Sequence, residues 1–438
     1  MTRRATIGVD VGTTTVKVVV AADDFEVLAE AASSTLSMHS DPTGRSEESP
    51  RQIIDCVVEA VNAAVHRTPD DVQPVALAVA SQSGSIVGLD ASGSPIGQLI
   101  TWMDSRSATL VETWRGSSLA ATIRSISGWN PGTGLGLATL AWIAANQPDR
   151  NDVAVWAGAD TLVTAFLTGA ISTNPSNAAA MQLADVSEGG WSTELCQLAG
   201  VEPGALPSLK SSGERLGRVT AEAASRCSLP VGLPVIAGGH DQTCAALALD
   251  VVEPGHVLVG SGTAWVVTSV AESRNLDVIS SRFNVSPHVV PGRITASEYL
   301  GGLGAEYGSW VNRTYGPITG HTTDQLDTFE LAEADIEASN SRGKQGLGIM
   351  IRSAEQVRDS LAQLTSSGLA LSRITLVGGI TASSVWPNII ADVTELPVDI
   401  PGDNSWPAIG AARLAATGAA TSHHPDSHPS PQAQEKTT

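Results

Sequence analysis

The chain is predicted to fold as an α/β protein of at least two domains, because it contains two similar strand-turn-strand segments set far apart. The first, ATIGVDVGTTTVKVVV, has strand composition at residues 7–9 and 16–20 with a turn between them. The second, HVLVGSGTAWVVTSV at 256–270, repeats that design around small residues at 260–263. The length of 438 residues is enough for two or three domains.

The first turn has the composition of a phosphate-binding hairpin. Gly12 allows a tight turn, and three hydroxyl donors follow it: Thr13, Thr14 and Thr15. Asp10 ends the preceding strand, where a carboxylate suits Mg²⁺ or its waters. Gly and Thr are also ordinary hairpin residues, so a turn without a ligand is an equal alternative for this segment alone. Neither GxxxxGK[ST] nor a GxGxxG between strand and helix occurs, which excludes a P-loop and argues against a dinucleotide fold.

The middle of the chain predicts a helix and two ligand-facing strand ends. Ser49, followed by Pro50 and Gln52, starts an amphipathic helix whose apolar residues recur at helical spacing over 53–65. A buried strand over 74–80 ends in small polar residues at 81–85, where open α/β sheets bind ligands. A second strand over 231–236 feeds glycines at 238 and 239 and then Asp241, which alone reads more readily as a helix N-cap than as a catalytic group.

Beyond a domain boundary expected near residues 250–255, further helices and strands follow. A helix is predicted over 354–364 and a strand over 374–377, and Gly378 and Gly379 after that strand let a flat ring lie against the backbone. From residue 421 the chain is polar and is predicted to be a disordered tail.

Composition excludes several classes of protein. With 25 basic and 45 acidic side chains the net charge is −20, which argues against a nucleic-acid partner. No apolar stretch has membrane-spanning length, and a strand begins too early for a signal peptide, so a cytoplasmic location is expected. The four cysteines are widely spaced without a Cys-x-x-Cys pair, which predicts neither a zinc site nor a disulfide framework.

The motifs together resemble those of the FGGY family of carbohydrate kinases, within the actin-like ATPase superfamily. DVGTTTVK and GSGTAWVV resemble its two phosphate motifs, and residues 375–398 its adenosine motif. The family's Trp-x-Asp-x-Arg segment is matched by TWMDSRS at 101–107, and its stretch with the catalytic Asp is matched by AGGHDQTCAALAL at 237–249. The family's last helix is similar to WPAIGAARLAA at 406–416. The resemblance implies two ribonuclease H-like domains with an interdomain catalytic cleft. The first domain, residues 1–250, would contain the sugar site, the first hairpin and the catalytic Asp. The second, residues 251–420, would contain the second hairpin and the adenosine motif, and residues 421–438 would be the tail.

The resemblance also implies site residues. Asp241 is the expected general base and Asp10 the catalytic carboxylate that holds Mg²⁺. The residues expected to bind ATP are Gly12, Thr13, Thr14, Thr15, Lys17, Gly262, Thr263, Gly304, Gly378, Gly379 and Ser383. Those expected to bind the sugar are Gln82, Ser83, Trp102, Asp104, Trp129, Asp241 and Gln242. A surface lysine at position 17 and a buried core tryptophan at 129 are equally weighted alternatives.

The implied activity is ATP-dependent phosphorylation of a hydroxyl on a small sugar or polyol. A pentulose such as xylulose is the expected substrate, and glycerol, erythritol or gluconate are the alternatives. Ser83 and Gly84 follow Gln82, which matches neither the Arg-Glu of glycerol kinases nor the Met-His of xylulokinases. The segment 314–348 is shorter than in relatives, which keeps a non-catalytic ATP or sugar sensor as an alternative. A chaperone-type ATPase would need a further domain, for which the polar tail leaves no room. ATP and the sugar are the expected partners, with a homodimer left open.

Overall fold

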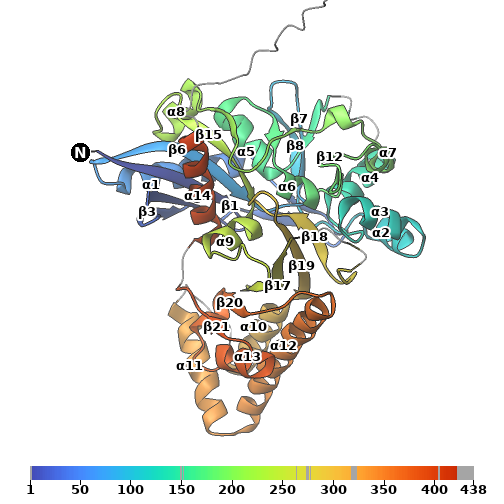
Figure 1. Ribbon diagram of the computed structural model, residues 1–438, viewed down its shortest axis with the longest axis vertical. Coiled ribbons are helices and arrows are strands. Elements are labelled where there is room, and N and C mark those ends of the chain that lie inside the picture. Colours follow the sequence, from blue (N-terminus) through green and yellow to red (C-terminus); the bar gives the residue numbers. More distant parts are fainter. Residues whose placement is uncertain are drawn as a thin grey trace, which may run out of the picture.

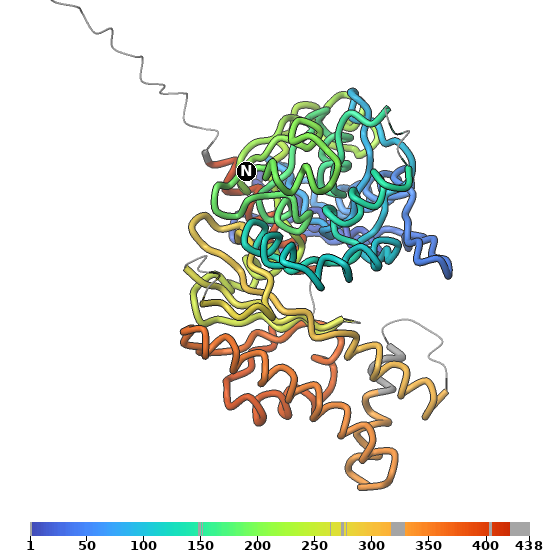
Figure 2. The backbone as a smooth tube through the Cα atoms, turned by 90° about the vertical axis from the view of Figure 1, so that its right-hand side faces the viewer, coloured from blue at the N-terminus to red at the C-terminus, as the bar shows by residue number. Residues whose placement is uncertain are grey.

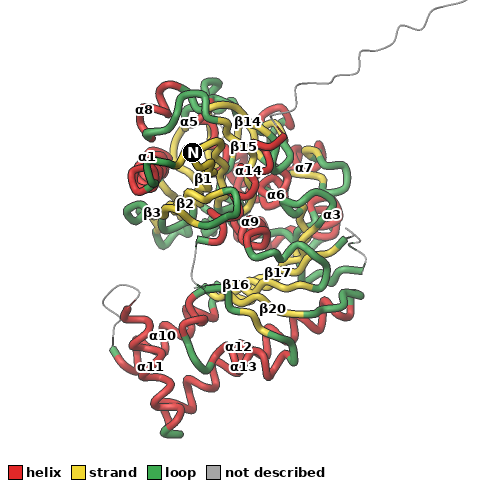
Figure 3. Tube along the Cα trace, turned by 60° about the vertical axis from the view of Figure 1, so that its left-hand side comes forward, coloured by secondary structure: helices red, strands yellow, loops and turns green. Residues whose placement is uncertain are grey.

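The computed structural model describes residues 2–147, 150, 152–262, 264–272, 276, 278–316, 323–402 and 405–421. It consists of two α/β domains, one above the other in Figure 1, and each contains a six-stranded sheet. Figures 2 and 3 show that the sheet of the second domain lies between the first domain and a layer of helices. The predicted α/β class with two sheet-containing domains is confirmed. Within the described ranges, no helix has the length and apolar character needed to cross a membrane.

The central sheet of the first domain has the strand order β14-β15-β6-β1-β2-β3. Its strands are β1 (Arg3–Val11), β2 (Val16–Ala22), β3 (Val27–Ala32), β6 (Val72–Ser81), β14 (Arg215–Arg218) and β15 (Pro234–His240). β1 and β2 form the predicted antiparallel hairpin, in which Asp10 is paired with Lys17. Because β6 is parallel to both β1 and β15, the C-terminal ends of these three strands meet at one edge of the sheet.

Helix α1 (Pro50–Arg67) covers this sheet and forms for the predicted reasons. The hydroxyl of Ser49 accepts a hydrogen bond from Gln52 N at 3.4 Å, which caps the first turn. Its apolar face, which includes Ile53 and Val57, is buried in one core with the strands.

The rest of the first domain surrounds this sheet. A five-stranded sheet consists of β4 (Met38–Ser40), β5 (Ser46–Glu48), β7 (Ile86–Leu89), β8 (Pro95–Ile100) and β9 (Val155–Ala157). Two short pairs are β10 (Ser172–Thr173) with β13 (Ser208–Leu209) and β11 (Ala184–Asp185) with β12 (Gly190–Trp191). The helices are α2 (Ala108–Arg115), α3 (Leu119–Ser127), α4 (Gly136–Asn146), α5 (Ala159–Thr168), α6 (Pro175–Ala180), α7 (Thr193–Ala199), η1 (Pro203–Ala205), α8 (Ala221–Cys227) and α9 (Asp241–Ala248).

The second domain has the strand order β18-β19-β17-β16-β20-β21. Its strands are β16 (His256–Ser261), β17 (Trp265–Ala271), β18 (Asn284–Pro287), β19 (Ile294–Gly301), β20 (Arg373–Val377) and β21 (Val398–Asp399). Its helices are α10 (Leu303–Tyr315), α11 (Thr323–Glu337), α12 (Ser341–Ser366), η2 (Gly379–Ala382) and α13 (Trp386–Thr394). Aromatic rings tie the helices to the sheet, since Trp386 lies 5.6 Å from Trp265 and 4.8 Å from Tyr307 between ring centroids.

Strand β15 differs from its prediction. We expected a strand over 231–236 with the glycines after it, but the strand begins at Pro234 and includes Gly238 and Gly239. The reason is close packing on β6, because a Cβ at Gly238 would lie 2.0 Å from the carbonyl oxygen of Val79. The glycines therefore bring two strands together rather than forming a loop, and His240, not Asp241, is the N-cap of α9.

The last helix, α14 (Trp406–Thr421), lies against the sheet of the first domain, between β1, β6 and β15 in Figure 1. The Thr6 hydroxyl donates to the Ala412 carbonyl at 3.0 Å, and a Cβ at Gly8 would meet the Ala408 carbonyl. The helix that we placed in a second domain of residues 251–420 therefore returns to the first. The boundary near residue 250 stays a prediction, and residues 422–438 of the expected tail lie outside the described chain.

Candidate active site

The turn of the first hairpin opens at the sheet edge where β1, β6 and β15 end. Gly12 and Thr13 are half-buried, and Thr14 is exposed. Thr15 leads into β2, and Lys17 on that strand is exposed beside Asp10. The hairpin thus presents hydroxyl groups and a lysine within one short segment, as a phosphate site requires.

Asp10 is 9% exposed, and its Oδ1 atom has no hydrogen-bond partner within the described chain. Burial raises the pKa of Asp10 to about 8; the negative charge of Asp241 adds to that rise and Lys17 opposes it. A buried carboxylate oxygen without a donor is suited to a cation, so Asp10 fits the predicted Mg²⁺ ligand. No group of three or more His, Cys, Asp or Glu side chains gathers in the described ranges, so phosphate oxygens and water would have to complete the coordination.

Asp241 is the first residue of α9 and is about one quarter exposed. Its Oδ1 atom accepts a hydrogen bond from Gln242 N at 2.6 Å and lies 3.0 Å from His240 Nε2. These two contacts hold one carboxylate oxygen, and the other, Oδ2, has no partner among the described residues. The side chain is therefore fixed in orientation while one oxygen can accept a proton.

A pocket of about 290 Å³ joins Asp241 to the first hairpin. The predicted residues that line it are Thr13, Gln82, Ser83, Trp102, Trp129, Asp241 and Gln242. The Nε1 atom of Trp102 donates to the Thr13 hydroxyl at 3.4 Å, which connects the indole to the hairpin turn. Residues more than 200 positions apart thus meet in one cavity with an aromatic wall and a carboxylate.

The second domain contributes residues to this pocket that we did not predict. They are Ala264, Val266, Asn284, Ser286, Thr295, Ser297 and Tyr299, mostly from β18 and β19. Trp129 Nε1 donates to the Ser286 hydroxyl at 2.7 Å, so this tryptophan lines the pocket and also bridges the two domains. Tyr299 is 61% exposed at the mouth. No motif marks these residues, and only their alternating polar positions on the two strands could have drawn attention to them.

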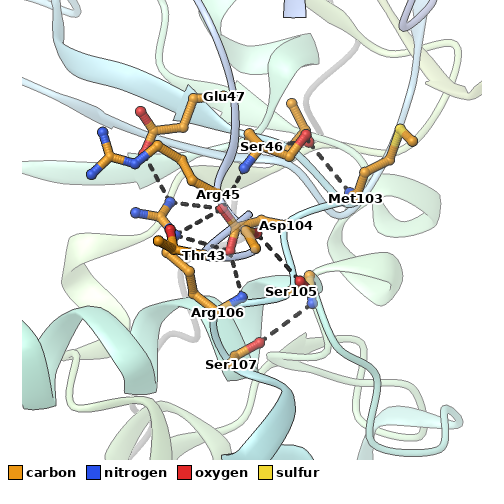
Figure 4. Close-up of polar contacts among 12 residues, drawn as sticks. Thr43, Arg45, Ser46, Glu47, Met103, Asp104, Ser105, Arg106 and Ser107 are labelled. Carbon is orange, nitrogen blue, oxygen red and sulfur yellow. Dashed lines mark hydrogen bonds and ion pairs between the residues drawn. The ribbon is translucent and has the colours of Figure 1, made fainter. Parts of the chain in front are cut away.

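Asp104 does not line the pocket, although we expected it to bind the sugar. It is 4% exposed, and Arg106 Nη2 lies 2.7 Å from Asp104 Oδ2 and 2.8 Å from Glu47 Oε1. Ser46 N also donates to Asp104 Oδ2 at 2.9 Å (Figure 4). Arg106 N and Nε donate to Asp104 Oδ1 at 3.0 and 3.1 Å. Both carboxylate oxygens therefore help to hold the Trp102 loop against β5, which supports the pocket from behind.

The predicted nucleotide residues of the second domain lie at the ends of β16 and β20. A Cβ at Gly378, whose φ is +104°, would lie 2.7 Å from the backbone of Ser261, so the two strand ends approach closely. Gly262 and Gly379 are exposed, and a Cβ at Gly379 would meet nothing within 4 Å. Gly379 thus borders open space beside the second hairpin. Thr263 lies outside the described residues.

Two other predicted nucleotide residues have local structural roles. Ser383 is buried; its hydroxyl donates to Glu333 Oε1 at 2.8 Å and accepts from Trp386 N at 3.0 Å at the start of α13. Gly304 lies in the first turn of α10. The structure does not bring either residue into the pocket that contains Asp241.

Sequence comparisons place these features in a known family. The model of the N-terminal domain of the FGGY family of carbohydrate kinases matches residues 5–248, and that of the C-terminal domain matches 310–419. The autoinducer-2 kinase of Yersinia enterocolitica is 28% identical over 326 residues, covering 64% of this chain and 60% of that enzyme's length. The Yersinia pestis autoinducer-2 kinase (strain Angola) is 27% identical, covering 78% of this chain and 72% of that enzyme.

Comparison with solved structures supports the same family. The xylulose kinase from Rhodospirillum rubrum superposes with a TM-score of 0.84 at 26% identity, covering 95% of this chain and 91% of that one. The Plasmodium falciparum glycerol kinase with ADP has a TM-score of 0.82 at 17% identity, covering 95% and 90%, and supports the fold. The chain has the actin-like ATPase fold and belongs to the FGGY family of carbohydrate kinases.

Proposed function

We propose that the protein transfers a phosphoryl group from ATP to one hydroxyl of a small uncharged sugar or polyol, with Asp241 as general base. The observation that supports this most strongly is the single pocket in which Asp241 faces the Thr13 turn and the indoles of Trp102 and Trp129. Phosphoryl transfer needs an oriented acceptor and charge stabilisation more than covalent help from the protein.

Each predicted group has a chemical task in this proposal. The free Oδ2 of Asp241 takes the proton of the attacking hydroxyl, while His240 and the Gln242 amide hold Oδ1. Thr13 and Lys17 face the phosphates from the first hairpin, and the exposed edge at Gly379 receives the adenine. Mg²⁺, held by Asp10 when ATP is bound, would neutralise charge on the triphosphate.

The lining of the pocket favours an uncharged acceptor. Among the described residues that line it, none is a lysine or an arginine, and Asp241 adds negative charge. A carboxylate-bearing sugar acid such as gluconate would bury its charge without a cation partner. The first compound to test is a pentulose such as xylulose, because a xylulose kinase is among the similar structures. The second is autoinducer-2, because autoinducer-2 kinases are among the relatives.

The test is a coupled ADP-release screen over pentuloses, hexuloses, polyols, aldonates and autoinducer-2. We expect Mg²⁺-dependent turnover with a neutral pentulose or a related compound, and at least a hundredfold lower turnover in Asp241→Asn with ATP affinity retained. ATP and sugar binding without turnover on any compound would instead favour the sensor. Near wild-type turnover in Asp241→Asn would refute the role of the base.

A further inference from the structure

Gln82 is a buried side chain of the sugar pocket whose amide forms hydrogen bonds through both its oxygen and its nitrogen. It is 4% exposed, and its Oε1 atom accepts hydrogen bonds from the Thr13 hydroxyl at 3.3 Å and the Ser85 hydroxyl at 3.4 Å. Each hydroxyl in turn accepts from Trp102, whose Nε1 donates to Thr13 at 3.4 Å and whose backbone N donates to Ser85 at 3.2 Å. Both lone pairs of the amide oxygen are therefore used within the protein.

The other end of the amide meets a buried carboxylate. Gln82 Nε2 donates to Glu48 Oε2 at 3.1 Å, and Glu48, at the end of β5, is only 1% exposed. Its second oxygen, Oε1, has no hydrogen-bond partner within the described chain, and no ion pair involves this side chain there. Burial raises the pKa of Glu48 to about 7, and the bond from Gln82 opposes that rise.

A carboxylate at this position is costly for folding. An apolar side chain of similar size would fill the same space without leaving a buried oxygen unpaired, and such replacements often stabilise a protein. Unsatisfied buried groups in native structures call for an explanation in function. Within the described ranges, the one group that hydrogen-bonds the Glu48 side chain is Gln82, a residue of the substrate pocket, so an explanation should be sought there.

We propose that Glu48 is a positioning residue that locks the Gln82 amide so that Nε2 points its second hydrogen at an oxygen of the substrate. The lock works by exclusion: a flipped amide would set the Gln82 oxygen against the Glu48 carboxylate, and its amino group against two hydroxyls that already accept hydrogen bonds from Trp102. With Oε1 saturated and one Nε2 hydrogen held by Glu48, Gln82 is left with a single donor for the ligand.

This assigns a recognition role to Gln82 and rests on the proposed function. The substrate oxygen that it contacts is an acceptor, either a hydroxyl or a carbonyl, and it lies on the side of the pocket shared with Thr13. Because a site with a fixed donor discriminates strongly against analogues that lack the matching oxygen, the locked amide should contribute to substrate selection.

The experiment compares Glu48→Met, Glu48→Gln and Gln82→Met, with Glu222→Gln, at an exposed glutamate of α8 that does not line the pocket, as the control. Each protein is assayed for the KM of the sugar, for kcat and for melting temperature, and sugar affinity is titrated through tryptophan fluorescence, since Trp102 lines the pocket. We expect Glu48→Met to raise KM and Kd for the sugar about tenfold, with little change in the KM of ATP and no fall in melting temperature.

The other variants separate orientation from charge and from folding. Glu48→Gln keeps an acceptor for Gln82 Nε2 and should stay within about threefold of wild type. Glu222→Gln changes an exposed glutamate outside the pocket and should leave sugar affinity unchanged. In the Gln82→Met background, Glu48→Met should have no further effect on sugar affinity.

Three results would overturn the inference: additive effects of the two methionine substitutions, an equal loss in Glu48→Gln, or a lower melting temperature in Glu48→Met with unchanged sugar affinity. Failure of the proposed function is distinguishable, because wild-type protein would then release no ADP with any sugar. In that case the fluorescence titrations still decide whether Glu48 acts through Gln82.

Discussion

Replacing Asp10 with asparagine should stabilise the ligand-free protein at high pH while abolishing turnover. Burial, with the charge of Asp241 as the second cause, raises the pKa of Asp10 to about 8 from the value of 3.8 expected in an unfolded chain. The folded state therefore keeps this proton up to about pH 8, whereas the unfolded state releases it near pH 4. The stability that the protonated carboxyl provides is complete below pH 4 and is lost as the pH rises toward 8.

The magnitude follows from the size of the shift. A difference of roughly four pKa units corresponds to at most about 6 kcal/mol between low and high pH. Asparagine has the same shape without the titration, so Asp10→Asn should match wild type within about 1 kcal/mol at pH 4 and exceed it by several kcal/mol at pH 9. Glu48, whose pKa is also raised, is common to both proteins and cancels in the comparison.

The assay is urea unfolding of both proteins without nucleotide or metal at pH 4, 6, 7.5 and 9. Lys17→Met provides a matched test, because Lys17 lowers the pKa of Asp10 and its loss should move the transition to higher pH. Mg²⁺ with ATP should stabilise wild type more than Asp10→Asn, since a charged carboxylate binds the cation more strongly than the neutral amide oxygen does. A stability difference that stays constant from pH 4 to pH 9 would refute the assignment of a raised pKa.

Three further predictions concern ligands. Gly379→Trp places a side chain where the structure leaves open space, so it should raise the KM of ATP with little effect on sugar binding measured without nucleotide; a loss of sugar affinity instead would show that the subsites are misassigned. Tyr299→Ala removes the most exposed of the described aromatic side chains that line the pocket and should raise the KM of the sugar several-fold, while an unchanged KM would remove Tyr299 from the site. Sugar with a non-hydrolysable ATP analogue should lower the radius of gyration and slow amide exchange near Gly12 and Gly262; profiles that do not change would contradict domain closure.

The elements that the sequence predicted well are those whose signals are local. The β1-β2 hairpin, the Ser49 cap of α1 and the strand that ends at Ser81 depend on turn chemistry, capping and apolar runs that a short window contains. The ends of β1, β6 and β15 then meet because the strands are parallel neighbours, so Thr13, Gln82 and Asp241 come together as expected.

The features that escaped prediction depend on contacts between distant segments. Gly238 lies inside a strand because β6 packs against it, and α14 leaves the second domain because the small residues of β1, such as Gly8, admit a helix at close range. Asp104 resembles a sugar ligand in sequence, yet the guanidinium of Arg106, two positions along, occupies its oxygens. The contributions of β18 and β19 follow only from the way in which the two domains meet.

The contacts between the two domains differ on the two sides of the cleft, and this difference indicates how the cleft could close. On the sugar side, Arg124 Nη1 donates to the Phe283 carbonyl at 2.7 Å, Val285 N donates to the Gly128 carbonyl at 2.9 Å, and Trp129 reaches the second domain through its indole. On the nucleotide side, Gly262 and Gly379 are exposed. A rotation that brings the hairpins together can therefore pivot on the hydrogen-bonded sugar side, where the pocket is already assembled, and change mainly the side where the triphosphate would be gripped.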